Sequence, residues 1–376
     1  MNVQSNTRQL TPDKVVFVAD YAAHYQGNFL SSLNSFEKAL RERGIEVEYV
    51  FPEKAPFEKW GSDYTVRHVV HPCDFKPGSL AQTLRELMKD DEFTVVHTHF
   101  LSLRSLIAIR KALKGCNCQV VFHEHMRLDW LSQGSPSTLL KKALYRRTLK
   151  DCKAVAVSSA VRDDLVAVLG SSENVYLVKN AISFDRLDDS GDQKAEGYDS
   201  GRDILIFGTH FMRKGVDIAL RAMQISDCNL RLIVLATNKE DAISRLQQLD
   251  PSWQDYCVVR HVVQDISSVY RSVLCFISPS RSEAFGYAVA EAAYCGAQVI
   301  ASDVPGQNTM KDIPNISWVA VDDAAALSVA IETCLERSNT GSSLLAKQRV
   351  ETKAYVKENY GLSSWVNEML GVYGVK

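Results

Sequence analysis

Short apolar runs and longer amphipathic stretches alternate along most of the chain. In the first half, β-branched runs that predict buried strands stand at 15–19, 45–51, 94–97, 119–122 and 154–157. Stretches with apolar positions three and four residues apart predict helices at 29–43, 102–114 and 138–150, and Gly44 is the expected stop of the first. Strands that alternate with helices in this way predict a parallel sheet with crossover helices.

The same alternation returns after a stretch, 185–202, that is acidic, contains Gly and Ser, and is nearly free of aliphatic residues. Further strands are predicted at 204–207, 230–235, 257–259, 274–278 and 298–301, and further helices at 216–224, 239–248 and 288–294. The rest of the chain, 324–372, has the pattern of helices only. The break in the pattern at 185–202 favours an interdomain linker.

These patterns predict an α/β protein with two Rossmann-like, doubly wound domains facing a central cleft, and a helical C-terminal tail. The predicted parts are a first domain at 1–185, a linker at 186–202, a second domain at 203–355 and a C-terminal helix at 356–376 that returns to the first domain. Doubly wound sheets bind ligands at the carboxyl ends of their strands. The chemistry is therefore expected in the cleft.

Composition excludes several classes of protein. The 376 residues are 46% hydrophobic and 23% charged, which is typical of a globular chain and excludes wholesale disorder. Lys and Arg number 43 against 45 Asp and Glu, a net charge of -2, so no nucleic-acid partner is expected. The apolar runs are strand-sized and residues 1–14 are polar, so we expect neither a membrane span nor export. Nine scattered cysteines favour reduced thiols and a cytoplasmic location.

The most informative segment is 278–296, which has the pattern of a strand, a turn and a helix of small residues. Glu283 falls in the turn and Glu291 inside the helix, whose N-terminus near Phe285 and Gly286 offers free amides to a phosphate or sugar oxygen. Two interpretations are open from the spacing alone. Either Glu283 caps the helix and Glu291 points to solvent, or the two carboxylates bind a ligand such as a ribose diol.

This segment, with the 302–306 sequence Ser-Asp-Val-Pro-Gly after it, resembles retaining glycosyltransferase family 4, the group 1 glycosyltransferases. The resemblance covers most of the chain. It implies a GT-B fold with an acceptor-side N-terminal domain and a nucleotide-sugar-binding C-terminal domain. It also implies that Glu283 holds hydroxyls of the donor sugar, that Glu291 binds the ribose, and that the backbone at Phe285, Gly286 and Tyr287 faces the donor.

A second segment, 207–217, leaves the first strand of the second domain and enters a helix, and basic residues at such a junction suit a diphosphate. It resembles the family's loop in which an Arg and a Lys neutralise the leaving diphosphate in place of a metal. Lys214 matches that Lys. Thr209 stands where the family has its Arg. Arg213, next to Lys214, is the nearest guanidinium and is the candidate to take the place of that Arg.

In the first domain, Gly27 and Asn28 follow the first strand and match the family's Gly-Gly loop beside the donor. His125 matches the strand-end histidine that lies beside the donor's anomeric centre in the family, and His123 is the alternative in a shifted register. These two and the pair 97 and 99 form H-x-H patterns that suit a metal, but no Cys or acid at ligand spacing completes a site except Glu124, which points to the other face of the strand. We therefore expect no metal and no cofactor.

Charge is concentrated in the segment 104–153, which holds eleven basic and three acidic residues. Its predicted helix carries Lys141, Lys142, Arg146 and Arg147 together with an aliphatic stripe. One interpretation is a peripheral contact with an anionic membrane surface. The other is a core-packed helix whose outer face is merely solvated.

The sequence therefore predicts a cytoplasmic, metal-independent, retaining hexosyltransferase. Its donor would be a UDP or GDP type of sugar nucleotide and its acceptor a glycan or glycolipid, as in bacterial cell-surface polysaccharide or glycolipid synthesis. Catalysis would rest on His125, Glu283, Lys214 and Arg213. Two alternatives are a non-catalytic GT-B subunit that partners another glycosyltransferase, for which Thr209 is the best support, and a nucleotide-sugar epimerase on the same scaffold.

Overall fold

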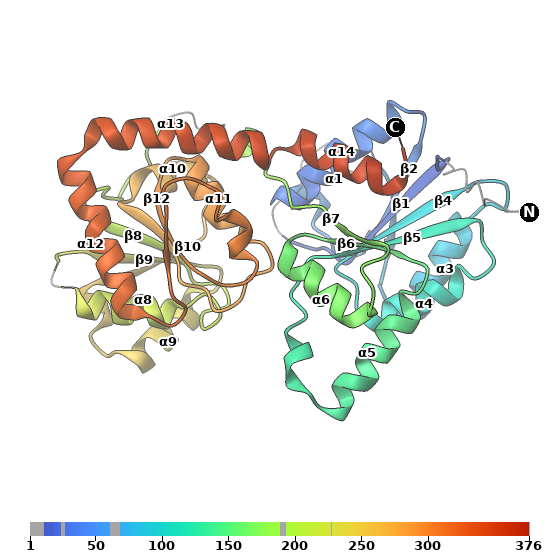
Figure 1. Ribbon diagram of the computed structural model, residues 1–376, viewed down its shortest axis with the longest axis horizontal. Coiled ribbons are helices and arrows are strands. Elements are labelled where there is room, and N and C mark those ends of the chain that lie inside the picture. Colours follow the sequence, from blue (N-terminus) through green and yellow to red (C-terminus); the bar gives the residue numbers. More distant parts are fainter. Residues whose placement is uncertain (1–10, 24–26, 61–67, 189–192, 227, 376) are drawn as a thin grey trace, which may run out of the picture. The chain divides into compact units, whose positions relative to one another are not determined.

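A computed structural model describes residues 11–23, 27–60, 68–188, 193–226 and 228–375 of the protein (Figure 1). Contacts divide the chain into two compact units. The N-terminal unit contains the chain up to Ala181 together with residues from Leu362 onward, and the C-terminal unit is Ile182–Gly361.

The N-terminal unit is built on a parallel sheet with the strand order β3-β2-β1-β4-β5-β6-β7. Its strands are β1 (Lys14–Ala19), β2 (Glu46–Pro52), β3 (Val69–Cys73), β4 (Thr94–His99), β5 (Cys118–Glu124), β6 (Lys153–Ala156) and β7 (Val175–Leu177). Every residue of β1 and β4 is buried, as expected for central strands covered on both faces. The order reverses between β1 and β4, which makes their carboxyl ends the switch point of this sheet.

Helices cover both faces of this sheet. They are α1 (Gly27–Arg41), α3 (Pro77–Leu87), α4 (Leu103–Ala112), α5 (Pro136–Thr148), α6 (Ser159–Leu169) and α14 (Leu362–Tyr373), with short 3-10 turns η1 (Phe57–Lys59) and η2 (Asp129–Gln133). In Figure 1, α1 and α14 lie on one face and α3 to α6 on the other. The last helix packs on the first, with Phe36 against Trp365 at 5.6 Å between ring centroids.

The C-terminal unit has a parallel sheet of order β10-β9-β8-β11-β12-β13. Its strands are β8 (Asp203–Phe207), β9 (Arg231–Ala236), β10 (Cys257–His261), β11 (Cys275–Ser278), β12 (Gln298–Ser302) and β13 (Ile316–Val319). Its helices are α7 (Asp185–Asp188), α8 (Val216–Ile225), α9 (Lys239–Leu249), α10 (Ile266–Ser272), α11 (Tyr287–Tyr294), α12 (Ala324–Thr340) and α13 (Ser342–Asn359), with η3 (Trp253–Asp255) and η4 (Gln307–Met310). The switch point lies between β8 and β11.

The prediction of two Rossmann-like parts with a helical tail is confirmed. Both sheets are parallel, the strand order of each reverses once, and helices flank them. Apart from the 3-10 turns, seven elements of the described residues were missed: β3, α3, α6, β7, α7, α10 and β13. The units divide after residues 181 and 361, whereas the sequence put the domain boundaries at 185 and 355. The segment predicted as a linker, 186–202, lies within the C-terminal unit, although residues 189–192 are outside the described part.

The predicted C-terminal helix at 356–376 is interrupted. Helix α13 continues to Asn359, and α14 begins at Leu362 after Tyr360 and Gly361. Among the described residues, no helix combines the length and the hydropathy that a membrane span requires.

Candidate active site at the switch point of the C-terminal unit

Two loops meet at the switch point of the second sheet. One follows β8 and contains Arg213 and Lys214; the other follows β11 and contains Glu283. The backbone N–H of Arg281 donates to the carbonyl oxygen of Arg213 at 2.8 Å. At Gly215 the first loop passes so close to the second that an added Cβ would lie 2.0 Å from the carbonyl oxygen of Pro279, so only glycine fits.

The Glu283 carboxylate is the centre of this meeting point. It is 8% exposed. Its Oε1 accepts hydrogen bonds from Lys214 Nζ at 2.5 Å and from the Ser280 hydroxyl at 2.9 Å, and Arg213 Nη1 lies 3.3 Å from its Oε2. Burial by itself would raise the pKa of the Glu283 carboxyl, but these partners hold that pKa below its usual value. The carboxylate is therefore ionised at neutral pH.

The immediate surroundings of the Glu283 carboxylate hold more positive than negative charge. Lys214 and Arg213 both contact Glu283, so two cations surround one carboxylate. The neighbouring Arg281 is balanced separately, because its guanidinium donates to both carboxylate oxygens of Asp217 at 2.8 and 2.7 Å and to Asp322 at 2.7 Å. The surplus charge at Lys214 and Arg213 is available to an anion.

Helix α11 begins beside Glu283. Gly286 is its N-cap, with φ of 99° in the left-handed region, and Phe285 before it is buried. Tyr287 is the first helical residue, and its ring packs edge-to-face on Phe285 with centroids 5.1 Å apart. Thr209 lies directly after β8 and Gly208, and it is half-buried. The predicted donor-binding residues Thr209, Phe285, Gly286 and Tyr287 thus belong to the same pair of strand ends and the helix that follows.

Hydrogen bonds among polar side chains hold the loop that contains Glu283. The Gln307 amide donates to the Ser278 hydroxyl at 2.6 Å, and the Ser302 hydroxyl donates to Gln307 Oε1 at 3.2 Å. An added Cβ at Gly306 would lie 1.9 Å from the carbonyl oxygen of Glu283 itself. Both the glycine and the glutamine therefore fix the backbone that carries the carboxylate.

Glu291 lies two turns into α11 and is 7% exposed. It forms an ion pair with Arg186 of α7. The interpretation in which Glu291 points to solvent is therefore wrong, because the helix face that carries it is covered. Arg186 was missed, since it falls in the segment predicted as a linker and is separated from Glu291 by 105 residues.

The first-domain residues of the predicted site lie in the N-terminal unit. Gly27 begins α1 with φ of 59°, which suits a glycine, and Asn28 beside it is buried. His125 directly follows β5. A hydrogen bond of 2.9 Å joins its Nε2 to His99 Nδ1. The Phe100 ring stacks on it at 4.2 Å. Burial lowers the pKa of His125 to about 3, so this imidazole is neutral at neutral pH.

The histidines form a buried stack. His97, His99 and His123 offer ring nitrogens that all lie within 4.8 Å of one another. Zinc-bound histidine nitrogens lie about 3.3 Å apart, because each Zn–N bond is roughly 2.0–2.1 Å. His97 Nε2 and His123 Nδ1 lie 3.3 Å apart, a spacing that suits a shared ion as well as a hydrogen bond, and His97 Nδ1 bonds to the Tyr373 hydroxyl at 2.8 Å. Hydrogen bonds thus join part of the stack, while His99 Nε2 and His123 Nε2 have no partner among the described residues, and the absence of a metal stays a prediction.

Helix α5, from the basic segment, exposes its aliphatic side chains. Leu139 and Leu140 are 66% and 64% exposed, whereas Thr138, Tyr145 and Thr148 are buried. Helix α5 thus packs through its buried residues and leaves the aliphatic stripe on its outer face, so both interpretations stay open. Lys141 extends over the ring of Trp130 at 4.2 Å.

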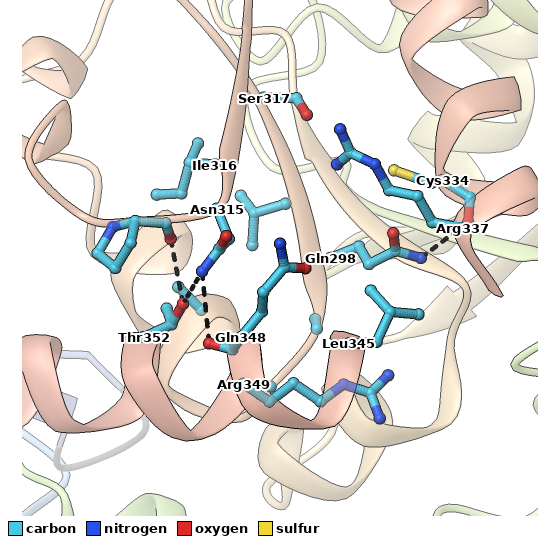
Figure 2. A pocket seen from close by; sticks show the side chains of 15 residues that line it. Gln298, Asn315, Ile316, Ser317, Cys334, Arg337, Leu345, Gln348, Arg349 and Thr352 are labelled. Carbon is cyan, nitrogen blue, oxygen red and sulfur yellow. Dashed lines mark hydrogen bonds between the residues drawn. The ribbon is translucent and has the colours of Figure 1, made fainter. Parts of the chain in front are cut away.

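A separate depression lies between β12, β13, α12 and α13 of the C-terminal unit. Figure 2 shows Gln298, Asn315 and Arg337 among the side chains around it. Asn315 Nδ2 donates to Thr352 Oγ1 at 2.9 Å, and Gln298 Nε2 donates to the carbonyl oxygen of Cys334 at 3.0 Å. These bonds tie α12 and α13 to the sheet. The lining includes none of the predicted site residues.

Comparison with known proteins agrees with this fold. The family model Glycosyltransferase Family 4 matches residues 32–186, and the model Glycosyl transferases group 1 matches residues 201–337. Between them the two models cover most of the chain. The chain therefore belongs to the family 4, group 1 glycosyltransferases.

A relative is the D-inositol 3-phosphate glycosyltransferase of Xylanimonas cellulosilytica, 28% identical over 178 residues, which are 45% of this chain and 41% of that protein. The match thus spans less than half of that relative's length. Among solved structures, a glycosyltransferase from Rickettsia africae has a TM-score of 0.76 at 18% identity, with 96% of this chain and 98% of that chain covered. Anabaena HepE in complex with UDP has a TM-score of 0.75 at 14% identity, with 96% and 99% covered. These likenesses concern the fold and agree with the predicted GT-B class.

Proposed function

We propose that the protein is a metal-independent, retaining hexosyltransferase that uses a nucleotide diphosphate sugar as donor. The observation that carries the proposal is the pair of cations, Lys214 and Arg213, around the buried carboxylate of Glu283 at the switch point of the second sheet. Family membership supports the reaction class, and HepE, a protein of similar fold, has been crystallised with UDP and with UDP-glucose. A UDP type of donor is therefore the first to test, and a GDP type the second.

In the proposed reaction, negative charge builds up on the departing diphosphate as its bond to the anomeric carbon breaks. Lys214 and Arg213 stabilise that charge from fixed positions, which is an efficient form of catalysis because no reorganisation is needed at the moment of reaction. The acceptor hydroxyl attacks the same face of the sugar and passes its proton to the leaving phosphate oxygen. The product then keeps the donor's anomeric configuration.

Glu283 has a different part in this reaction. Its hydrogen bonds to donor hydroxyls strengthen as the sugar ring becomes cationic, so it contributes more in the transition state than in the ground state. Lys214 links the two roles, because it contacts Glu283 and lies in the loop proposed to face the diphosphate. Glu291 would bind the ribose, and the backbone at Phe285, Gly286 and Tyr287, together with Thr209, would face the rest of the donor. The roles of His125, Gly27 and Asn28 at the donor stay predictions from the family resemblance.

We further propose that the acceptor is a glycan or glycolipid handled at the cytoplasmic face of a membrane, as in bacterial cell-surface polysaccharide or glycolipid synthesis. Helix α5 supports this, because exposed leucines and basic side chains lie together on it. Aliphatic side chains enter the headgroup region while Lys and Arg pair with anionic lipids.

The function is tested by donor-dependent nucleotide release from a panel of UDP- and GDP-sugars, with glycan and glycolipid acceptors. NMR of the new linkage should show the donor's anomeric configuration. Glu283→Gln should lower turnover by about tenfold or more, because it removes a charged hydrogen-bond acceptor worth roughly 1.5–3 kcal/mol. Lys214→Ala should weaken UDP binding far more than uridine binding, since only UDP carries the diphosphate.

Lys347→Ala is the matched control, because it removes an exposed lysine of α13. An inverted product, or unchanged turnover in Glu283→Gln, would refute the proposed mechanism. Turnover that disappears with a chelator such as EDTA and returns with Mg²⁺ would refute metal independence.

A further inference from the structure

Arg186 reaches the proposed nucleotide site from the segment that enters the C-terminal unit. It belongs to the short helix α7, and its Nη2 donates to Oε1 of Glu291 in the middle of α11. Glu291 is buried, and Arg186 is half-buried. The carboxylate proposed to bind ribose is therefore held by an arginine that no motif of the family resemblance includes.

The backbone around Arg186 is fixed on both sides. Phe184 packs on the Tyr294 ring with centroids 4.3 Å apart, and the Tyr294 hydroxyl donates to Asp188 at 2.8 Å. Leu187 between them is fully buried, and its carbonyl oxygen accepts from Arg271 of α10 at about 3.4 Å. The segment is thus packed against α10 and α11, so the position of the Arg186 guanidinium follows from the fold.

Two buried donors near Glu291 lack a partner. Arg186 Nε is buried and makes no hydrogen bond among the described residues. The Tyr270 hydroxyl is likewise buried and unpaired, and the charges of both Glu291 and Arg186 act on it. Buried polar groups are almost always satisfied, and leaving one unsatisfied costs about 1–3 kcal/mol. Unpaired donors beside a buried carboxylate point to a ligand that brings both hydroxyl donors and oxygen acceptors.

We propose that Arg186 is a positioning residue for the nucleotide: it holds Glu291 in the orientation in which the carboxylate accepts from the ribose diol. This inference rests on the proposed function, because it concerns the same donor. A ribose supplies hydroxyls that donate to Glu291 and oxygens that accept from the guanidinium. An arginine suits this arrangement because its planar fork donates in two directions at once.

The test measures dissociation constants for UDP and 2′-deoxy-UDP by titration calorimetry, or for GDP and 2′-deoxy-GDP if the protein prefers guanine. Arg186→Ala should bind UDP at least about tenfold more weakly than the parent, the loss expected for one charged hydrogen bond. Because Arg186 acts through Glu291, the parent's preference for UDP over 2′-deoxy-UDP should also shrink in this variant. Combining it with Glu291→Gln should weaken binding little beyond Glu291→Gln alone.

Arg245→Ala is the matched control. It also removes an arginine that is paired with a carboxylate, Asp241, but on the exposed face of α9. It should bind both nucleotides as the parent does. Circular dichroism checks that the variants are folded. If Arg186→Ala does not fold, Arg186→Lys replaces it, because it keeps the charge, lacks the second donor direction and should give intermediate affinity.

The outcomes separate the two proposals. Parental affinity and parental ribose preference in Arg186→Ala, or in Arg186→Lys where that variant is used, would overturn this inference and leave the proposed function intact. A uniform loss with unchanged ribose preference would also overturn it, because that is what a purely structural role produces. A folded parent that binds neither UDP nor GDP would overturn the proposed function and this inference together.

Discussion

A buried charge is costly unless its partners are fixed, and Glu283 shows how this chain provides them. The Ser280 hydroxyl, the Lys214 ammonium and the Arg213 guanidinium all approach the same carboxylate. Because the partners come from two loops, the carboxylate also links the loops that follow β8 and β11. The site therefore depends on Glu283 for its shape as well as for its proposed chemistry.

This arrangement predicts a pH dependence of stability. The pKa of Glu283 is lowered in the folded protein, so the stabilisation that its charge provides is complete above the unfolded pKa of about 4.3 and is lost as the pH falls through the folded value. Glu283→Gln lacks this titration. The difference in unfolding free energy between parent and variant should therefore be constant from pH 7 to about pH 5 and should shrink at lower pH.

Urea unfolding at a series of pH values measures this difference. Glu336→Gln, an exposed change on α12, is the control and should track the parent at every pH. A difference between parent and Glu283→Gln that grows on acidification would contradict the assignment of an ionised, stabilised carboxylate.

Some site residues could be predicted from the sequence and others could not. Glu283, Glu291 and Lys214 stand at fixed spacings around a strand end and a helix start, and such local patterns are visible in a linear chain. The contact of Arg213 with Glu283 could not be predicted, because it depends on the path of the loop. Arg186 has no such signal, since only the folded segment brings it to Glu291.

Among the helices and strands, hydrophobic periodicity identified the central strands and the edge strand β10, but it missed the other edge strands, β3, β7 and β13. The central strands are apolar runs because both of their faces are covered. By contrast, β3 contains Pro72 and exposed positions, and β7 has only three residues, so neither has a strong pattern. Helix α6 did carry signals that could have found it, with Ser158 as N-cap and Gly170 in the left-handed conformation as C-cap.

Helix α5 leads to a prediction about membrane surfaces. Replacing Leu139 and Leu140 by Ser, together with Lys142→Gln and Arg147→Gln, should strongly reduce binding to vesicles that contain anionic phosphatidylglycerol. Each basic residue near such a surface contributes about 1 kcal/mol, and each leucine that enters the headgroup region adds about 1.5–3 kcal/mol. Binding of the parent should fall with added salt, and vesicles of neutral phosphatidylcholine should bind it weakly.

Sedimentation with vesicles measures this binding. The control carries Val329→Ser and Leu344→Ser, which remove equally exposed aliphatic side chains from α12 and α13. It should sediment as the parent does. Equal sedimentation of the α5 variant and the parent would exclude α5 as the contact.

The chain as a whole leaves the N-terminal unit once, after Ala181, and returns to it at Leu362. The core of the N-terminal unit is consequently built from both ends of the sequence: Val15 and Phe36 pack with Trp365, Met369 and Tyr373. The sequence predicted a C-terminal helix that returns to the first domain, but that it packs on α1 is a property of the folded chain. The Tyr373 hydroxyl also bonds to His97, so the histidine stack has a partner from the last helix.

This dependence gives a prediction for the stability of the N-terminal unit. Met369 is fully buried in the core shared by α1 and α14, so Met369→Ala leaves a cavity there and should lower the unfolding free energy of that unit by about 2–5 kcal/mol. Leu344→Ala, an exposed position on α13, should change it by less than about 0.5 kcal/mol. Urea unfolding with and without UDP separates the units, because a ligand held by the C-terminal unit shifts only the transition of that unit. Met369→Ala should lower the transition that UDP does not shift, whereas an equal effect of both substitutions would show that α14 contributes nothing to the N-terminal core.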